Sequence, residues 1–322
     1  MDSGDASALE LIIDAITTCK PLLIVCADPL NQRRPDAHFA AEADAAARAR
    51  FEIALFSYEE VHTNDAYRAI RQIAPTPGRF ALLRSWMLRT EHYAELFDAL
   101  LRKGVRLIND PAAYRTCHEL PSTYAWIAAH TPATVWIARE QIADTDAIMA
   151  TLRPFGDRPV ILKDFVKSLA HAWAEACFIP AASDRATVER VVARFLALRG
   201  DDLQGGLVFR AYEPFAQAAA PVSSRPVVRE YRRYVLNGQV IETVLYWDGA
   251  DGHAPLPPAQ LFADVLVQLP SRFFTIDVAE REDGVWRIVE LGDGQVAGLL
   301  PLIDLNRFYR SVHQALREHA DG

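Results

Sequence analysis

The first third of the chain alternates between apolar runs and amphipathic stretches. Residues 21–28 (PLLIVCAD) are almost continuously apolar, which is typical of a parallel strand buried on both faces. An Ala-rich amphipathic stretch at 37–50 predicts a helix, and residues 51–57 (FEIALFS) predict a second strand. This order predicts a βαβ unit and a small parallel sheet of the α/β class. No Gly-rich fingerprint follows the first strand, so the pattern does not favour a dinucleotide-binding domain.

Further blocks of strands and helices follow. Residues 80–101 predict a strand or turn that runs into an amphipathic helix, and residues 105–109 a third strand. In the later part, the residue alternation of 227–238 places Arg232 on one face of a strand and Arg233 on the other. We therefore expect three parts: an amino-terminal α/β domain at 1–110, a central subdomain at 111–208, with helices at 142–152 and 183–200, and a more α+β-like carboxyl-terminal subdomain at 209–322.

Two runs rich in β-forming residues flank Asp283-Gly284, a dipeptide typical of a two-residue hairpin turn. With these residues at the centre of the turn, counting outward pairs Ala279 with Ile288 and Asp277 with Glu290. The sequence therefore predicts two carboxylates directly opposite each other on adjacent strands.

This pair of carboxylates predicts a cation site. Residues opposed in an antiparallel pair hold their Cβ atoms about 4.5–5.5 Å apart, and like charges there are destabilising. Magnesium removes that repulsion, and it takes one or two carboxylates together with water and phosphate oxygens. We expect Asp277 and Glu290 to bind Mg²⁺, with Asp293 as a candidate third ligand. The alternative is an exposed edge hairpin with solvated carboxylates.

Several basic residues stand where phosphate would neutralise them. Lys163 ends a buried strand, where an unpaired ammonium is costly, and a loop with Lys167 and Ser168 follows it. Phosphate is the obvious partner for Lys163. Arg210 and Arg232 lie within later strands, and for both a cross-strand salt bridge is the alternative to a phosphate contact.

Two other arginines are candidates for binding an anionic substrate. Arg33 lies in the segment after the first strand, at the carboxyl end where open α/β sheets usually bind ligands. Arg84 lies between an apolar run and a helix. The alternatives are a solvated loop for Arg33 and ordinary core packing around Arg84. His118 has no nucleophile at a recognisable spacing, so we expect a structural histidine there.

Composition narrows the functional classes. The chain has 322 residues and a formal net charge of −8, which argues against a general nucleic-acid or membrane-surface role because such binding needs clustered Lys and Arg. Its apolar runs are too short to span a bilayer. The four cysteines lack metal-binding spacing, and the acidic start lacks the basic region of a signal peptide. We expect a cytoplasmic protein without nucleic-acid or membrane partners.

The ordered motifs resemble the ATP-grasp superfamily, and more narrowly its clade named for two arginines and one lysine. The similar stretches are VILKDFVKS, GLVFRAYEPF, EYRRYVLNG, FTIDVA and VELGDGQVAGL. Together they extend over about residues 109–300. The preceding βαβ region resembles that clade's amino-terminal domain. The resemblance implies two subdomains that enclose a nucleotide.

The resemblance also implies roles for individual residues. Lys163 would contact the α- and β-phosphates, Arg210 and Arg232 would be the two arginines, and Lys167 and Ser168 would lie in a loop that closes over the phosphates. Tyr212 and Glu213 would meet adenine, largely through their backbone. Many relatives have Asn where this chain has Gly292, which leaves the third metal ligand open between Asp293 and none.

The implied chemistry is ATP-dependent ligation. A carboxylate attacks the γ-phosphate, and an amine captures the resulting acyl phosphate, with release of ADP and phosphate. Such a reaction needs mainly positioning and charge neutralisation. The implied cofactors are ATP and Mg²⁺, and the substrates a small-molecule or peptide carboxylate and an amine acceptor. The alternative is a non-catalytic ATP-binding module that assists the assembly of other proteins.

Overall fold

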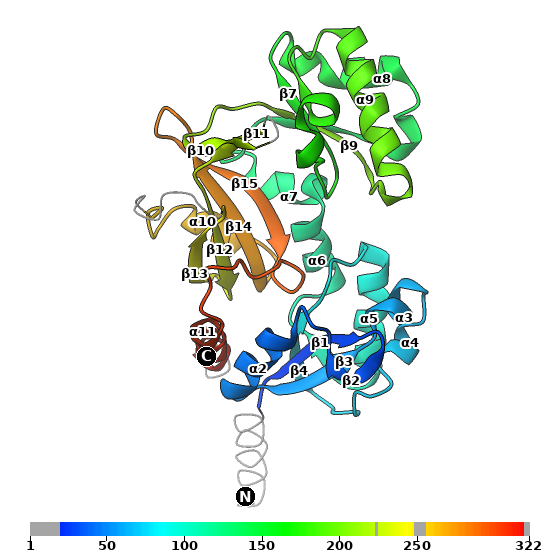
Figure 1. Ribbon diagram of the computed structural model, residues 1–322, viewed down its shortest axis with the longest axis vertical. Coiled ribbons are helices and arrows are strands. Elements are labelled where there is room, and N and C mark those ends of the chain that lie inside the picture. Colours follow the sequence, from blue (N-terminus) through cyan, green and yellow to red (C-terminus); the bar gives the residue numbers. More distant parts are fainter. Residues whose placement is uncertain (1–19, 223–224, 248–255, 319–322) are drawn as a thin grey trace, which may run out of the picture.

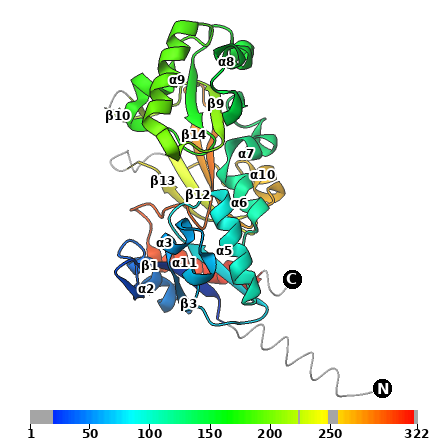
Figure 2. The ribbon, with the colours of Figure 1, turned by 90° about the vertical axis from the view of Figure 1, so that its right-hand side faces the viewer.

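Three sheets organise the part of the chain that the computed structural model describes, which is residues 20–222, 225–247 and 256–318. Figure 1 shows them stacked along the long axis, with the amino-terminal sheet at the bottom, the carboxyl-terminal sheet in the middle and the central sheet at the top. The view turned by 90° in Figure 2 shows the same order. This mixture of sheets and helices confirms the predicted α/β class.

The amino-terminal sheet confirms the predicted βαβ unit. β1 (Leu22–Asp28) pairs in parallel with β3 (Glu52–Phe56) on one side and β4 (Arg79–Arg84) on the other. β4 pairs in turn with β5 (Val105–Leu107), and α2 (Ala40–Arg48) connects β1 to β3. All residues of β1 before Asp28 are buried, as a strand covered on both faces requires.

The segment after β1 is a second strand instead of the predicted loop. β2 (Asn31–Pro35) folds back antiparallel to the end of β1. The turn forms because Asp28 Oδ1 accepts hydrogen bonds from the backbone N–H of Leu30 (2.8 Å) and of Asn31 (3.1 Å), an arrangement for which Asp is well suited.

The central sheet is antiparallel, in the order β6 (Thr134–Ala138), β9 (Gly206–Ala211), β7 (Val160–Asp164), β8 (Phe178–Ile179). Buried apolar residues of α8 (Thr145–Leu152) and α9 (Arg185–Arg199) pack against it. β9 continues beyond residue 208, so the boundary predicted there falls inside a strand.

The carboxyl-terminal sheet is also antiparallel, in the order β13 (Gln239–Leu245), β12 (Glu230–Leu236), β14 (Phe273–Glu280), β15 (Trp286–Asp293). The turn between β12 and β13 uses Asn237-Gly238, both at positive φ, as a two-residue hairpin turn of this kind requires.

The remaining elements connect these sheets. α6 (Pro111–His118) and α7 (Leu120–Ile127) contribute buried residues to the core of the carboxyl-terminal sheet. α11 (Leu305–Glu318) lies beside α2 in Figure 1, and Arg48 Nε donates to Asn306 Oδ1 (2.8 Å). The other α-helices are α3 (Tyr58–His62), α4 (Ala66–Ala69), α5 (Thr90–Arg102) and α10 (Ala263–Gln268), and β10 (Gln217–Val222) and β11 (Arg225–Val228) form a small hairpin.

The hairpin of β14 and β15 departs from the predicted register in two places. Its loop has three residues instead of two, because Arg281 N donates to Val285 O (2.9 Å), and Gly284 supplies the left-handed residue, with φ of 83°, that such loops use. A bulge next to Asp277 then shifts the pairing back. The two shifts cancel, so Asp277 does face Glu290, whereas Ala279 faces Arg287 and the predicted pairing with Ile288 is wrong.

No helix among the described residues is both long and apolar enough to cross a membrane.

Candidate functional site

A cavity of about 170 Å³ opens where the three parts of the chain meet. Its floor is formed by the ends of β14 and β15, and its walls by the segment after β4, the end of α6, the loop after β7, Arg232 and Tyr246. The lining residues are Met87, Cys117, His118, Val166, Lys167, Arg232, Tyr246, Thr275, residues 290–293 and residues 296–298.

One ion pair at this cavity joins the central sheet to the carboxyl-terminal sheet. Lys163, at the end of β7, donates from Nζ to Glu290 Oε1 at 2.6 Å. Lys163 is buried, but the Glu290 side chain is 44% exposed and therefore accessible to a ligand. Desolvation raises the pKa of Glu290, but the Lys163 ammonium, assisted by Lys167 and Arg232, outweighs it and lowers the pKa below the ordinary value. Glu290 is ionised at neutral pH.

A second ion pair lies within the carboxyl-terminal sheet. Arg232 on β12 is directly opposite Asp277 on β14, and its guanidinium donates to both carboxylate oxygens, at 2.8 and 2.7 Å. Burial alone would lower the pKa of Arg232, but the Asp277 carboxylate raises it well above the ordinary value. The guanidinium also lies over the Tyr246 ring, 4.8 Å from its centroid. The salt bridge that the sequence left open as an alternative is present for Arg232.

The loop with Lys167 and Ser168 is shaped by Asp164, a residue that the sequence analysis missed. The fully buried Asp164 carboxylate accepts from the backbone N–H of Val166 (2.7 Å) and of Lys167, and it pairs with Arg199 at 2.7 Å. An Asp at the end of an apolar strand is a common turn signal, and that signal could have identified it. Lys167 lines the cavity and Ser168 is exposed beside it.

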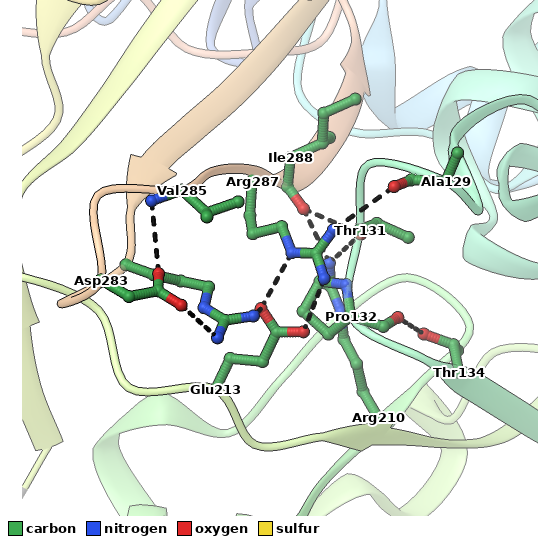
Figure 3. Close-up of polar contacts among 11 residues, drawn as sticks. Ala129, Thr131, Pro132, Thr134, Arg210, Glu213, Asp283, Val285, Arg287 and Ile288 are labelled. Carbon is green, nitrogen blue, oxygen red and sulfur yellow. Dashed lines mark hydrogen bonds and ion pairs between the residues drawn. The ribbon is translucent and has the colours of Figure 1, made fainter.

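Arg210 lies outside the cavity lining, contrary to the phosphate-contacting role expected for it. Its guanidinium donates to the carbonyl of Ile288 (2.9 Å), to the carbonyl of Val289 and to the Thr131 hydroxyl, as Figure 3 shows for Ile288 and Thr131. Burial lowers the pKa of Arg210 to about 10. Arg210 therefore binds the bulged stretch of β15 that immediately precedes Glu290.

Tyr212 and Glu213 follow β9, on the connection from the central to the carboxyl-terminal sheet. The Glu213 carboxylate is held by Arg287 (3.0 and 3.3 Å) and Arg281 (3.4 Å) of the β14–β15 hairpin, and Figure 3 shows the contact with Arg287. Tyr212 N donates to Pro159 O (3.0 Å). The side chain of Glu213 and the backbone N–H of Tyr212 are thus occupied.

Asp293 lies at the cavity but apart from the other two carboxylates. Its carboxylate is buried and accepts from Asn109 Nδ2 (2.6 Å) and Gln295 N (2.9 Å). Burial raises its pKa to about 6. Within the described ranges, no group of three or more His, Cys, Asp or Glu side chains could hold a metal ion. The structure thus brings Asp277 and Glu290 together and gives Asp293 other partners.

Arg84 is not available to a substrate carboxylate, which corrects the expectation from the sequence. Its buried guanidinium donates to Glu42 (2.8 and 3.2 Å) and to the carbonyls of Gly294 and Ala297 (both 2.7 Å). Arg84 therefore holds the loop that lines one wall of the cavity. Arg33 is exposed on β2 and does not line the cavity.

Comparison with known proteins agrees with this arrangement. A family model for the ATP-grasp domain, family 3 of the clade named for two arginines and one lysine, matches residues 154–312. This range contains both ion pairs and the loop with Lys167 and Ser168. No curated protein matches the chain at a significant level.

Solved structures align with almost the whole chain. A RimK-domain ATP-grasp protein from Sphaerobacter thermophilus is 14% identical with a TM-score of 0.57, and the alignment covers 92% of this chain and 98% of that one. D-cycloserine synthetase DcsG is 17% identical with a TM-score of 0.56, covering 93% and 99%. The ATP-grasp ligase PsnB, solved with a minimal precursor, Mg and ADP, is 13% identical with a TM-score of 0.54, covering 94% and 98%. At these identities the likeness shows the fold, which is the ATP-grasp fold.

Proposed function

The chain carries an ATP-grasp domain of the two-arginine, one-lysine clade at residues 154–312, and from that premise we propose that it is an ATP-dependent ligase. The proposed reaction activates a carboxylate as an acyl phosphate, with release of ADP, and an amine then captures the acyl group with release of phosphate. Use of ATP favours the cytoplasmic location expected from the sequence.

The observation that carries this proposal is the pair of opposed carboxylates, each with its own cation. Asp277 and Glu290 face each other across β14 and β15, and Arg232 and Lys163 neutralise them. With Lys167 and Asp293, which also line the cavity, the site holds three cations and three carboxylates. Such a site suits a polyphosphate that is bound together with a metal ion. The cations of the site then pair with the phosphates, and the carboxylates pair with the metal ion.

The donor chemistry fits Mg²⁺. Asp277 and Glu290 would hold the ion, and two carboxylates with phosphate and water oxygens are what magnesium usually takes. Asp293 is left out of this set because Asn109 and Gln295 already hold its carboxylate. When bound, the ion would neutralise charge on the phosphate oxygens.

The basic residues of the cavity divide the remaining work. Lys163, released from Glu290, would contact the nucleotide phosphates, and Lys167 and Ser168 would approach them from the loop after β7. Arg232, released from Asp277, would stabilise the charge that develops as the phosphoryl group moves. Arg210 would act indirectly, by fixing the bulged carbonyls next to Glu290. Backbone groups of Tyr212 and Glu213 would meet the adenine.

The chemistry needs no nucleophilic side chain. An oxygen of the substrate carboxylate forms a bond to the γ-phosphorus while the bond from that phosphorus to the β-phosphate oxygen breaks, and ADP leaves with the electron pair. The amine nitrogen then forms a bond to the acyl carbon, the carbon–oxygen bond to phosphate breaks, and the proton that nitrogen loses passes to the released phosphate. Positioning and charge neutralisation by Arg232 and the lysines are what this sequence requires.

The substrate class is proposed from the same considerations. PsnB is a ligase that has also been solved with a precursor peptide, and DcsG is a synthetase of D-cycloserine, a small molecule. A cavity of about 170 Å³ suits a small reacting group. We propose an amino acid or the end of a peptide as one substrate.

Product analysis tests the proposal. The purified protein is incubated with Mg-ATP and pools of amino acids and small acids, and nucleotide products are separated by chromatography. We expect ADP and phosphate that depend on one pool and that are absent from the variant Asp277→Asn/Glu290→Gln. AMP and pyrophosphate would contradict the proposed chemistry. ATP binding without turnover in any pool would favour the alternative of a non-catalytic assembly module.

A further inference from the structure

His118 has an unsatisfied nitrogen in the wall of the cavity. The residue ends α6, its side chain is buried, and it lines the cavity. No described residue lies in hydrogen-bonding geometry with its buried Nε2, although the Gln204 side chain interacts with the imidazole, and no other cavity-lining residue that the structure describes has such an atom. Because leaving a buried polar atom unpaired is costly, this nitrogen points to a ligand atom that would pair with it.

The imidazole is held in place by an aromatic stack. It stacks on Tyr114 with ring centroids 4.9 Å apart, and Tyr114 stacks on Tyr93 at 3.9 Å. Tyr114 is fixed by hydrogen bonds between its hydroxyl and the backbone of Leu88, and the Tyr93 hydroxyl donates to Asn109 O (2.7 Å). The ring is therefore preorganised, as a binding residue should be.

The protonation state of His118 limits the ligand. Burial lowers its pKa to about 4, so the ring is neutral at pH 7. In a neutral imidazole one nitrogen donates a hydrogen bond and the other accepts one, and Nε2 is the acceptor when Nδ1 carries the proton. Arg232 and Lys167, which line the same cavity, can bind the substrate carboxylate and the nucleotide phosphates. The substrate amine, in contrast, needs a hydrogen-bond acceptor.

The carboxylates of the cavity, which could also accept a hydrogen bond from an amine, already have partners. Glu290 pairs with Lys163, and Asp293 accepts from Asn109 and Gln295. We propose that Nε2 of His118 accepts a hydrogen bond from the acceptor amine and thereby places it for attack on the acyl group. This proposal rests on the proposed ligase function and assigns the amine site to the end of α6.

The test compares amine and acid kinetics. Wild type is first incubated with Mg-ATP, the twenty amino acids as acids, and hydroxylamine, which traps an acyl phosphate as a hydroxamate. A pool of amino-acid amides, which have an amine but no free carboxylate, then replaces hydroxylamine, and KM is measured for the amide that is ligated. The variants are His118→Phe, which keeps the stack on Tyr114, and His118→Gln, whose amide reaches the position of Nε2. His92→Phe is the control, because Nδ1 of His92 also lacks a partner among the described residues but lies outside the lining.

We expect His118→Phe to raise the KM for the amide about tenfold, the effect of one lost hydrogen bond, with the KM for ATP within twofold of wild type. His118→Gln should recover most of the loss, and His92→Phe should match wild type. If His118→Phe does not fold, His118→Leu is held to the same criterion.

Four results would overturn the inference. An unchanged KM for the amide in His118→Phe would show that His118 does not contact the amine. A rise in the KM for the acid instead would show that His118 contacts the acid. Hydroxamate formation without ligation of any amide would also overturn it, while leaving the ligase function intact. If wild type forms no hydroxamate, both the proposed function and this inference are contradicted.

Discussion

At the residue scale, the cavity is built from charges that hold each other in place. Lys163 and Glu290 connect two sheets, and Arg232 and Asp277 are neighbours within one. Lys163 and Arg232 were each expected to pair with an anion, and each pairs with a carboxylate. A buried ion pair such as Arg232–Asp277 adds little net stability compared with apolar residues, but removing one of its two members is costly. The presence of such a pair at a cavity is therefore better explained by ligand binding than by stability.

Removing one member of the Arg232–Asp277 pair should destabilise the fold. In Arg232→Met the Asp277 side chain, only 3% exposed, loses its cation, and we expect the free energy of unfolding to fall by about 3 kcal/mol. Arg232→Met/Asp277→Leu should regain most of that stability, yet neither variant should turn over ATP. Urea unfolding followed by circular dichroism measures the first effect. Equal losses in the single and double variants would contradict this account.

Asp293 should make stability depend on pH. Its folded pKa of about 6 is above the ordinary value of 3.8, so its contribution is fully present below about pH 4 and is lost as pH rises through 6, by about 3 kcal/mol in all. We expect Asp293→Asn to flatten the stability curve between pH 4 and 7. Urea unfolding across that range tests this, with the exposed Asp283→Asn as control. If the pH dependence of the free energy of unfolding in Asp293→Asn parallels that of wild type, Asp293 is not its cause.

At the element scale, the β14–β15 hairpin shows how far sequence reasoning reaches. Alternation and the Asp283-Gly284 turn signal placed Asp277 opposite Glu290, but the pairing holds only because the three-residue loop and the bulge shift the register in opposite directions. The three-residue loop and the bulge were not predicted, and Arg210, a residue of another sheet that leaves no trace in the local pattern, binds the carbonyls of Ile288 and Val289 in the bulged stretch. The contacts of Arg210 and Arg84 with backbone carbonyls were likewise not predicted. The local pattern around an arginine in a strand is the same whether its side chain faces a ligand or backbone carbonyls.

The pair Thr275 and Gly292 sets a steric limit inside the hairpin. The two are directly opposed, and a Cβ at residue 292 would lie 2.8 Å from Thr275 Oγ1. We expect Gly292→Asn to lower the free energy of unfolding by about 1–3 kcal/mol through overpacking. Adding Thr275→Ala should restore at least half.

Thermal melts of these variants measure the effect. Gly298→Ala serves as control, because nothing lies within 4 Å of a Cβ there. A melt of Gly292→Asn equal to wild type would show that the hydroxyl moves aside freely.

At the scale of the whole molecule, the cavity depends on all three parts. The central sheet supplies Lys163, the carboxyl-terminal sheet supplies the carboxylates, and the amino-terminal domain holds the wall loop through Arg84. The order of motifs was sufficient for the fold class because each motif covers all or part of one strand, in most cases with the segment that follows it. Contacts between the parts, such as that of Arg84 with Gly294, join residues distant in sequence and leave no local pattern.

Ligand binding should therefore stabilise the whole chain. We expect Mg-ATP at a hundred times its Kd to add about 2.7 kcal/mol to the free energy of unfolding. ATP with a chelator should add much less, and Asp277→Asn/Glu290→Gln should lose the difference between the two conditions. Thermal melts with and without magnesium measure it. Equal stabilisation with and without the metal would contradict the assignment of Asp277 and Glu290.

The most direct test of the central claim follows one oxygen atom. Once a pool that supports ADP release has been narrowed to one acid, that acid is labelled with ¹⁸O in its carboxylate and the released phosphate is analysed by mass spectrometry. An acyl phosphate passes one carboxylate oxygen to phosphate, so we predict one ¹⁸O atom in each phosphate released by ligation. Phosphate without the label would show that the acid is not activated in this way and would contradict the account.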